Sequence, residues 1–238
     1  MPKSLSEKEL MVAMEDNASQ FSRRKFLGYA GAASALMVGV AACTRTQDLS
    51  QATRTNVHEV DLGSGDIGIL NYAYALEQLE AAFYSHVIFS QYSGIPPAEA
   101  ALLTDIRDHE ISHREFFKNA LGGMAIPPLD FDFSTIDFSS RTSVLATSKA
   151  FEDLGVSAYN GAGRLIINPD YLVLAGKIVS VEARHAAYIR NLIAKASFAD
   201  DTVVDAMGLD VTRKPTEVLQ IAKAYIKTTI KADNLPTY

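Results

Sequence analysis

Two short motifs in this 238-residue sequence combine a carboxylate with an imidazole at helical spacing. Glu110 precedes His113 by three residues, and Glu182 precedes His185 by the same interval. In an α-helix this spacing places both side chains on one face. Carboxylates and imidazoles are ligands of divalent first-row metal ions. Each motif is therefore a candidate half-site for a metal.

Both motifs interrupt apolar stripes that repeat with the period of a helix. The stripes consist of Leu103, Ile106, Phe117 and Ala120 on one segment and of Tyr171, Ala175, Ile178, Ile189 and Leu192 on the other. Such stripes face a protein core, so we expect both motifs to be buried. An ionised buried Glu is costly unless it is paired or bound to a cation. One motif alone would suggest a neutral His bonded to a carboxylate, whereas two motifs together with two further Glu residues at matching offsets favour a metal.

Two further Glu residues repeat in the same way. Glu77 and Glu152 each precede a Tyr, Tyr84 and Tyr159, by seven residues. The two Glu residues are 75 positions apart, and the two Glu-x-x-His motifs are 72 positions apart. The sequence therefore reads as a duplicated helical hairpin. A pseudo-twofold axis would bring both copies to one centre.

The choice between Glu77 and Glu80 is less direct. Glu80 points nearer the middle of the apolar arc, but the second copy has Gly155 at the equivalent position. Internal symmetry therefore selects Glu77. Glu80 stays a candidate for a bridging carboxylate or for a group that supports the ligands, as do Tyr84 and Tyr159. The two Tyr residues are expected to be hydrogen-bonding core aromatics.

Helical periodicity predicts the elements that must position these side chains. Four long helices are expected at residues 66–91, 97–121, 141–167 and 170–196, and a shorter fifth at 215–231. The connection 122–140 is too long for a simple helical hairpin, and its alternating Phe residues are expected to pack on the helices. Strand signals are weak. Two hairpins joined by a long crossover match one topology of the four-helix bundle.

Three stretches resemble the bacterial ferritin-like domain proteins, among them those described as desiccation-associated or stress proteins. They are LNYAYALEQLEAAFY at residues 70–84, FEDLGVSAY at 151–159 and VEARH at 181–185. The resemblance implies an all-α, ferritin-like four-helix bundle over residues 65–197, with a long crossover and an additional short C-terminal helix in the extension 198–238. It also implies a centre of two Fe or two Mn ions, held by Glu77, Glu110, His113, Glu152, Glu182 and His185.

The chemistry of this ligand set leaves two functions open. Hard and borderline ligands suit iron or manganese, and zinc also fits but would be idle towards oxygen. The first hypothesis is an oxidoreductase acting on O2, peroxide or Fe(II), of ferroxidase or catalase type, in oxidative or drying stress. The alternative is a non-catalytic structural or binding protein of the cell envelope, in which the metal only stabilises the bundle.

The first 43 residues read as an export signal. Arg23 and Arg24 lie in a stretch that closely resembles the twin-arginine signal, and a short apolar run follows. The run ends at Cys43 in a sequence that looks like a lipobox, and residues 44–64 read as a polar tether. These features imply a transient encounter with the twin-arginine translocase and a location on the periplasmic or envelope side, with a lipid anchor in the membrane.

The remaining composition excludes several classes. The formal net charge is −6 and no basic stripe is present, so nucleic-acid binding has no support. A single Cys excludes an internal disulfide and a Cys-based zinc or rubredoxin-type site. A closed storage cage is disfavoured because a lipid on each subunit would hinder it, although a homo-oligomer of another kind stays open.

Overall fold

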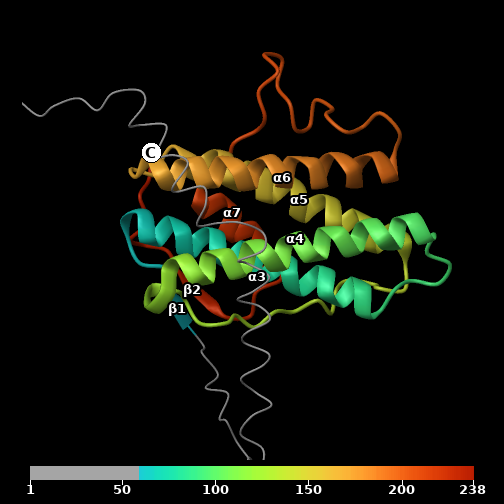
Figure 1. Ribbon diagram of the computed structural model, residues 1–238, viewed down its shortest axis with the longest axis horizontal. Helices are drawn as coiled ribbons and strands as arrows, with labels where there is room; N and C mark the ends of the chain where they lie inside the picture. The colour runs from blue at the N-terminus through green and yellow to red at the C-terminus, as the bar shows by residue number, and fades with distance from the viewer. Residues whose placement is uncertain (1–58) are drawn as a thin grey trace, which may run out of the picture. The chain divides into compact units, whose positions relative to one another are not determined.

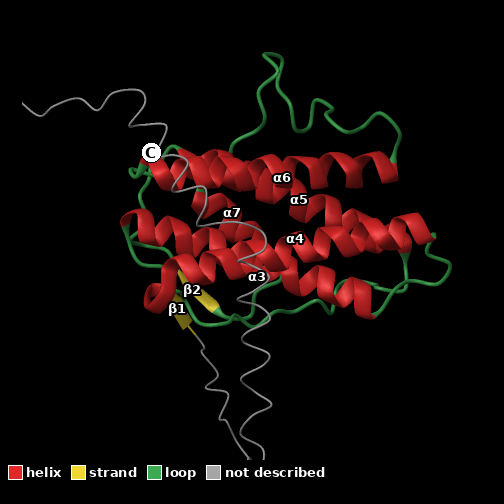
Figure 2. Cartoon of the chain, viewed as in Figure 1, coloured by secondary structure: helices red, strands yellow, loops and turns green. Residues whose placement is uncertain are grey.

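The computed structural model describes residues 59–238. The predicted signal with Arg23, Arg24 and Cys43, and most of the predicted tether, lie outside the described residues. Four long helices and a short fifth one dominate the described part (Figures 1 and 2). Their bounds are Gly65–Phe89 (α3), Pro97–Leu121 (α4), Arg141–Gly163 (α5), Pro169–Ile193 (α6) and Pro215–Ala222 (α7), with a single 3₁₀ turn, η2, at Gly122–Met124.

The helix starts follow local sequence signals. Pro97, Pro169 and Pro215 occupy first-turn positions, where no backbone N–H is needed. The side chain of Asn168 caps α6 by accepting a hydrogen bond from the backbone N–H of Asp170. Within residues 59–238, no helix is both long and apolar enough to cross a membrane.

The four long helices form two antiparallel hairpins, as predicted. Helix α3 packs along α4, and α5 packs along α6, while α3 also contacts α5. The prediction of an all-α bundle with four long helices is therefore confirmed. The observed bounds agree with the predicted ones to within a few residues, except at the fifth helix.

Helix α3 is the most deeply buried element. Of its 25 residues, 17 are buried, compared with six of the 25 in α6. The crossover between α4 and α5 covers the outer side of α3, where Phe133 and Phe138 pack against Phe83. Two polar residues of α3 hold the crossover through its backbone. Asn71 accepts from the N–H of Ile126 at 3.0 Å, and Gln78 accepts from that of Leu129 at 2.9 Å.

The predicted fifth helix is wrong in its second half. Helix α7 ends at Ala222, and residues Thr229–Lys231 form a strand, β2, that pairs in parallel with β1 at Glu59–Asp61. Buried Val60 and Leu62 anchor β1 on the core. The last residues assigned to the tether are therefore part of the folded domain. Sequence analysis missed both strands because each has only three residues.

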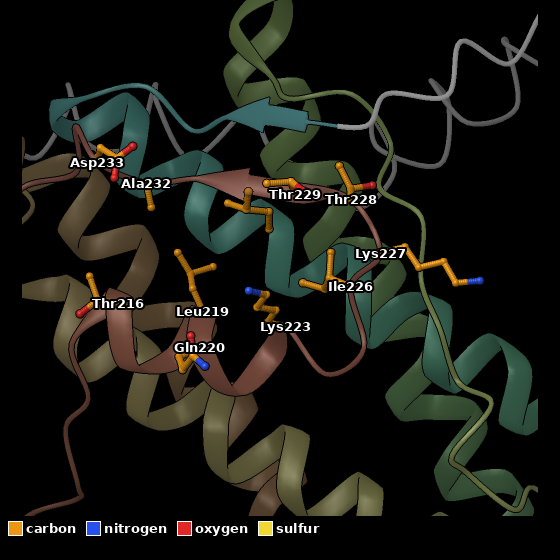
Figure 3. A pocket seen from close by; sticks show the side chains of 11 residues that line it. Thr216, Leu219, Gln220, Lys223, Ile226, Lys227, Thr228, Thr229, Ala232 and Asp233 are labelled. Atoms are coloured by element: carbon orange, nitrogen blue, oxygen red, sulfur yellow. The ribbon is translucent and has the colours of Figure 1, made fainter.

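A surface pocket of about 330 Å³ lies between α7 and β2 (Figure 3). Leu219 and Ile226 supply apolar lining, and Lys223 and Asp233 supply charge. None of the pocket's lining residues is a predicted metal ligand.

The segment between α6 and α7 packs closely against α5 at Gly161. The backbone N–H of Arg213 donates to the carbonyl of Ser157 at 3.1 Å. A Cβ on Gly161 would lie 1.7 Å from the carbonyl oxygen of Arg213, closer than two non-bonded atoms can approach. The side chain of Arg190, 2% exposed, fastens the same segment by binding both Asp153 and Asp200.

We predict that Gly161→Ala destabilises the protein by about 1–3 kcal/mol, because the new methyl group must displace the backbone at Arg213. The measurement is the free energy of unfolding in urea. Gly176→Ala in α6 is the matched control. It meets nothing within 4 Å and should stabilise by about 0.5–1 kcal/mol through helix propensity. Equal effects of the two substitutions would contradict the close contact.

Candidate metal centre

The six predicted ligands come together at the centre of the bundle. Glu77 lies on α3, Glu152 on α5, and α4 and α6 each supply one Glu-x-x-His motif. We call these residues the Glu/His cluster: Glu77, Glu110, His113, Glu152, Glu182 and His185. All four carboxylate residues are 0% exposed, and both imidazoles are largely covered. Burial of so many acidic groups in one core calls for cations.

The cluster divides into two groups that share two members. One group is Glu77, Glu110, His113 and Glu182, and the other is Glu110, Glu152, Glu182 and His185. Within each group, one ligand atom from each residue lies within 4.8 Å of all the others. Glu110 and Glu182 belong to both groups, so these two carboxylates lie where the groups overlap.

The distances show a pseudo-twofold arrangement. Glu110 Oε1 is 2.8 Å from Nδ1 of His185, and its Oε2 is 3.7 Å from Nδ1 of His113. Glu182 mirrors this pattern, with Oε1 2.9 Å from His113 Nδ1 and Oε2 3.7 Å from His185 Nδ1. Each shared carboxylate therefore directs one oxygen to each half of the site.

The other two carboxylates each serve one half. Glu77 Oε2 lies 3.4 Å from Nδ1 of His113, and Glu152 Oε2 lies 3.5 Å from Nδ1 of His185. Their second oxygens accept hydrogen bonds from tyrosines of the opposite hairpin. Tyr84 donates to Glu152 at 2.5 Å, and Tyr159 donates to Glu77. The structure thus places both predicted tyrosines beside ligand candidates, where they fix the carboxylate orientation.

The polar atoms of the cluster fit a metal better than they fit one another. Eight buried atoms of its residues have no hydrogen-bond partner within residues 59–238: Glu77 Oε2, both oxygens of Glu110 and of Glu182, Glu152 Oε2, and Nδ1 of both histidines. Several are close together, yet the N–H directions miss the oxygens. Unsatisfied buried polar atoms are rare and need an explanation. Metal coordination supplies one, because it uses the lone pairs that converge here.

The electrostatics of the cluster are strongly coupled. Burial and repulsion by Glu182 raise the pKa of Glu110 to about 8. Burial would also raise the pKa of Glu182, but the two imidazoles outweigh burial and lower it to about 2. Burial lowers the pKa values of His113 and His185, whereas the neighbouring carboxylates raise both well above the ordinary range. Without metal, the protonated imidazoles of His113 and His185 supply positive charge to the cluster.

Glu80 lies one helical turn beyond Glu77 and is also buried, at 4% exposure. Burial and repulsion by Glu110 raise the pKa of its carboxyl group well above the usual value. Its Oε1 would be 3.1 Å from a Cβ at position 155, so Gly155 leaves room for this carboxyl group. Glu80 is outside both four-residue groups. Its position beside the cluster suits a supporting role more than a core ligand.

His109 lies beside the apolar stripe, a position that predicts a residue facing solvent or a neighbouring helix. Sequence analysis did not identify its partner. The side chain is exposed, but Nδ1 of His109 lies 2.9 Å from Nε2 of His185 on α6. Position 109 is one turn before His113, so the sequence places it near the cluster. It does not identify the partner, because the pairing crosses between helices.

A buried Glu/His cluster inside an all-α bundle of two hairpins is the arrangement of a ferritin-like protein, and the cluster is compatible with bound metal. The sequence model of the ferritin-like domain family matches residues 65–195. The chain therefore belongs to the ferritin-like domain family. Comparison with curated proteins finds no match.

Metal binding should displace protons from the cluster. At neutral pH, Glu110, His113 and His185 hold protons because their pKa values are raised, and a metal ligand must be deprotonated. We predict that Mn(II) affinity rises as the pH increases from 6 to 8, because the proton on Glu110, whose pKa is about 8, becomes easier to displace. Titration calorimetry in two buffers of different ionisation enthalpy measures the affinity and the protons released. A pH-independent affinity without proton release would contradict these protonation states.

Proposed function

We propose that this protein is an exported di-metal carboxylate oxidoreductase that acts on O2, peroxide or Fe(II). The observation that carries the proposal is the sharing of Glu110 and Glu182 between two four-ligand groups. A structural site for one ion needs a single closed ligand set. Two overlapping sets joined by bridging carboxylates fit a pair of ions.

In this proposal, the residues of the chain have distinct roles. Glu110 and Glu182 bridge the two positions, while Glu77 with His113 and Glu152 with His185 complete one position each. Two Fe or two Mn ions would supply redox chemistry at this centre when bound, and Zn would fill it without redox activity. Tyr84 and Tyr159 hold the two terminal carboxylates from the opposite hairpin.

The surroundings of the site support chemistry that needs protection from water. The carboxylate side chains are at most 1% exposed. Phe83 and Phe151 form an edge-to-face pair beside Tyr84. A reactant that reaches such a centre must be small, which favours O2, peroxide or a single Fe(II) ion over an organic substrate.

Metal analysis of the purified protein tests the centre. Protein from cells supplied with iron and manganese should carry about two metal ions per chain. A Glu110→Ala, Glu182→Ala double variant should lose them, because both bridging groups are removed. Glu115→Gln on α4, a half-exposed carboxylate paired with Arg114, is the matched control and should keep its metal. Metal-free, folded wild-type protein would overturn the proposal.

The alternative function is a metal-stabilised structural or binding protein of the envelope. It is favoured by the depth of the site, because the same burial that protects a reactive centre would also lock four helices around an inert ion. Turnover separates the two functions. Loaded protein should decompose peroxide or oxidise Fe(II) in the first case. In the second, metal should raise the thermal midpoint without turnover.

Export and lipid anchoring are supported by the sequence features at Arg23, Arg24 and Cys43. We predict that replacing both arginines by lysine leaves the protein in the cytoplasmic fraction. Replacing Cys43 by serine should permit export but release the protein from the membrane fraction, because the lipid-bearing thiol is lost. Immunoblots of cell fractions measure both outcomes. Unchanged fractionation of the double-lysine variant would exclude the twin-arginine route.

A further inference from the structure

His109 and His185 form a histidine pair across the α4–α6 interface. Nδ1 of His109 lies 2.9 Å from Nε2 of His185, and the ring planes are within 9° of parallel. The ring centroids are 5.1 Å apart, much further than the two nitrogens. Because the two ring planes are nearly parallel, they cannot be much further apart than the two contacting nitrogens. Most of the distance between the centroids is therefore a sideways displacement of one ring relative to the other. The contact is an in-plane hydrogen bond, not a stack.

The direction of this hydrogen bond follows from the other side of His185. Its Nδ1 lies 2.8 Å from Glu110 and 3.5 Å from Glu152, so Nδ1 is the ring nitrogen that points into the cluster. A metal-binding Nδ1 must be unprotonated, so the remaining ring proton lies on Nε2. Nε2 then donates to Nδ1 of His109, which accepts. The second proton of the pair lies on Nε2 of the exposed His109 ring.

The other half of the site lacks this partner. The offset of 72 residues between the two motifs makes Val181 the counterpart of His109. Val181 cannot accept a hydrogen bond through its side chain. Among the residues from 59 to 238, no hydrogen bond joins the second nitrogen of His113 to the protein. The pseudo-twofold symmetry of the ligands is therefore broken just outside them.

We infer that His109 is a positioning residue that makes the two metal positions unequal. It fixes the ring orientation and proton location of His185, so the position formed with Glu152 is preorganised. The position formed with Glu77 and His113 has no such support from the described residues, 59–238, and binds its ion more weakly. The inference deepens the proposed function and depends on its two metal positions. Partners of this kind typically change metal affinity by about 10- to 100-fold.

The competing explanation is that His109 acts on His185 only by packing against its ring. Two substitutions of His109 distinguish packing from hydrogen bonding. His109→Phe keeps a flat ring against His185 but removes the acceptor. His109→Asn loses the ring but keeps an oxygen near the position of Nδ1. If the hydrogen bond matters, Asn should behave like wild type and Phe should not. If packing matters, the order should reverse.

The test is a titration of the full-length metal-free protein with Co(II), followed by its visible d–d absorption. Wild-type protein should show two steps, with the tighter step first. His109→Phe should weaken the tighter step by about 10- to 100-fold and leave the weaker one in place. His109→Asn should restore most of the difference. Asp108→Asn is the control for a changed exposed side chain on α4, and it should match wild type.

The outcomes distinguish this inference from the proposed function. Two cobalt steps that are identical in wild type and His109→Phe would overturn the role of His109 and leave the di-metal centre intact. Absence of cobalt binding in the wild-type protein would overturn both. A tighter step that survives in Phe but is lost in Asn would assign the contact to packing.

Discussion

Four ionisable carboxylates at the centre of a helical core are the constraint on which this structure depends. Each would be unstable there alone, because burial favours its neutral form. In the bundle, two imidazoles and two tyrosine hydroxyl donors surround these carboxylates, and the lone pairs of the cluster converge. The apolar core supplies the stability that tolerates this arrangement. The aromatic groups around Phe83 and the burial of most of α3 belong to that support.

Much of this arrangement is legible in the sequence because helical geometry links spacing to direction. Glu and His three residues apart share one face of a helix. Once the bounds of α4 and α6 are predicted correctly, both side chains of each motif are therefore expected to point into the core. The internal repeat then brought Glu77 and Glu152 to the same level. The repeat does not predict contacts between residues that are not equivalent in the two copies. The partnership of His109 with His185 depends on how α4 and α6 are rotated, which no local spacing encodes.

Short and non-local pairings account for the other misses. Residues 229–231 carry apolar and polar residues that continue a helical pattern, yet they pair with residues 59–61 from the other end of the domain. A three-residue strand has no periodicity to recognise, and its stability comes from a distant partner. Gly161 shows the same limit, since its need for a bare Cα arises from the backbone at Arg213. Such constraints appear only when the whole chain is assembled.

The unequal burial of α3 and α6 also determines where the sequence is free to vary. Helix α3 is enclosed by its neighbours and by the crossover, so at most of its positions a new side chain must fit the space of the original one. A substitution of Asn71 or Gln78 would also break a hydrogen bond to the crossover. Helix α6 meets the rest of the bundle along a narrow strip and exposes Val173 and Tyr188. Evolutionary change in the outer surface of this domain can therefore accumulate on α6, while α3 preserves the geometry of the centre.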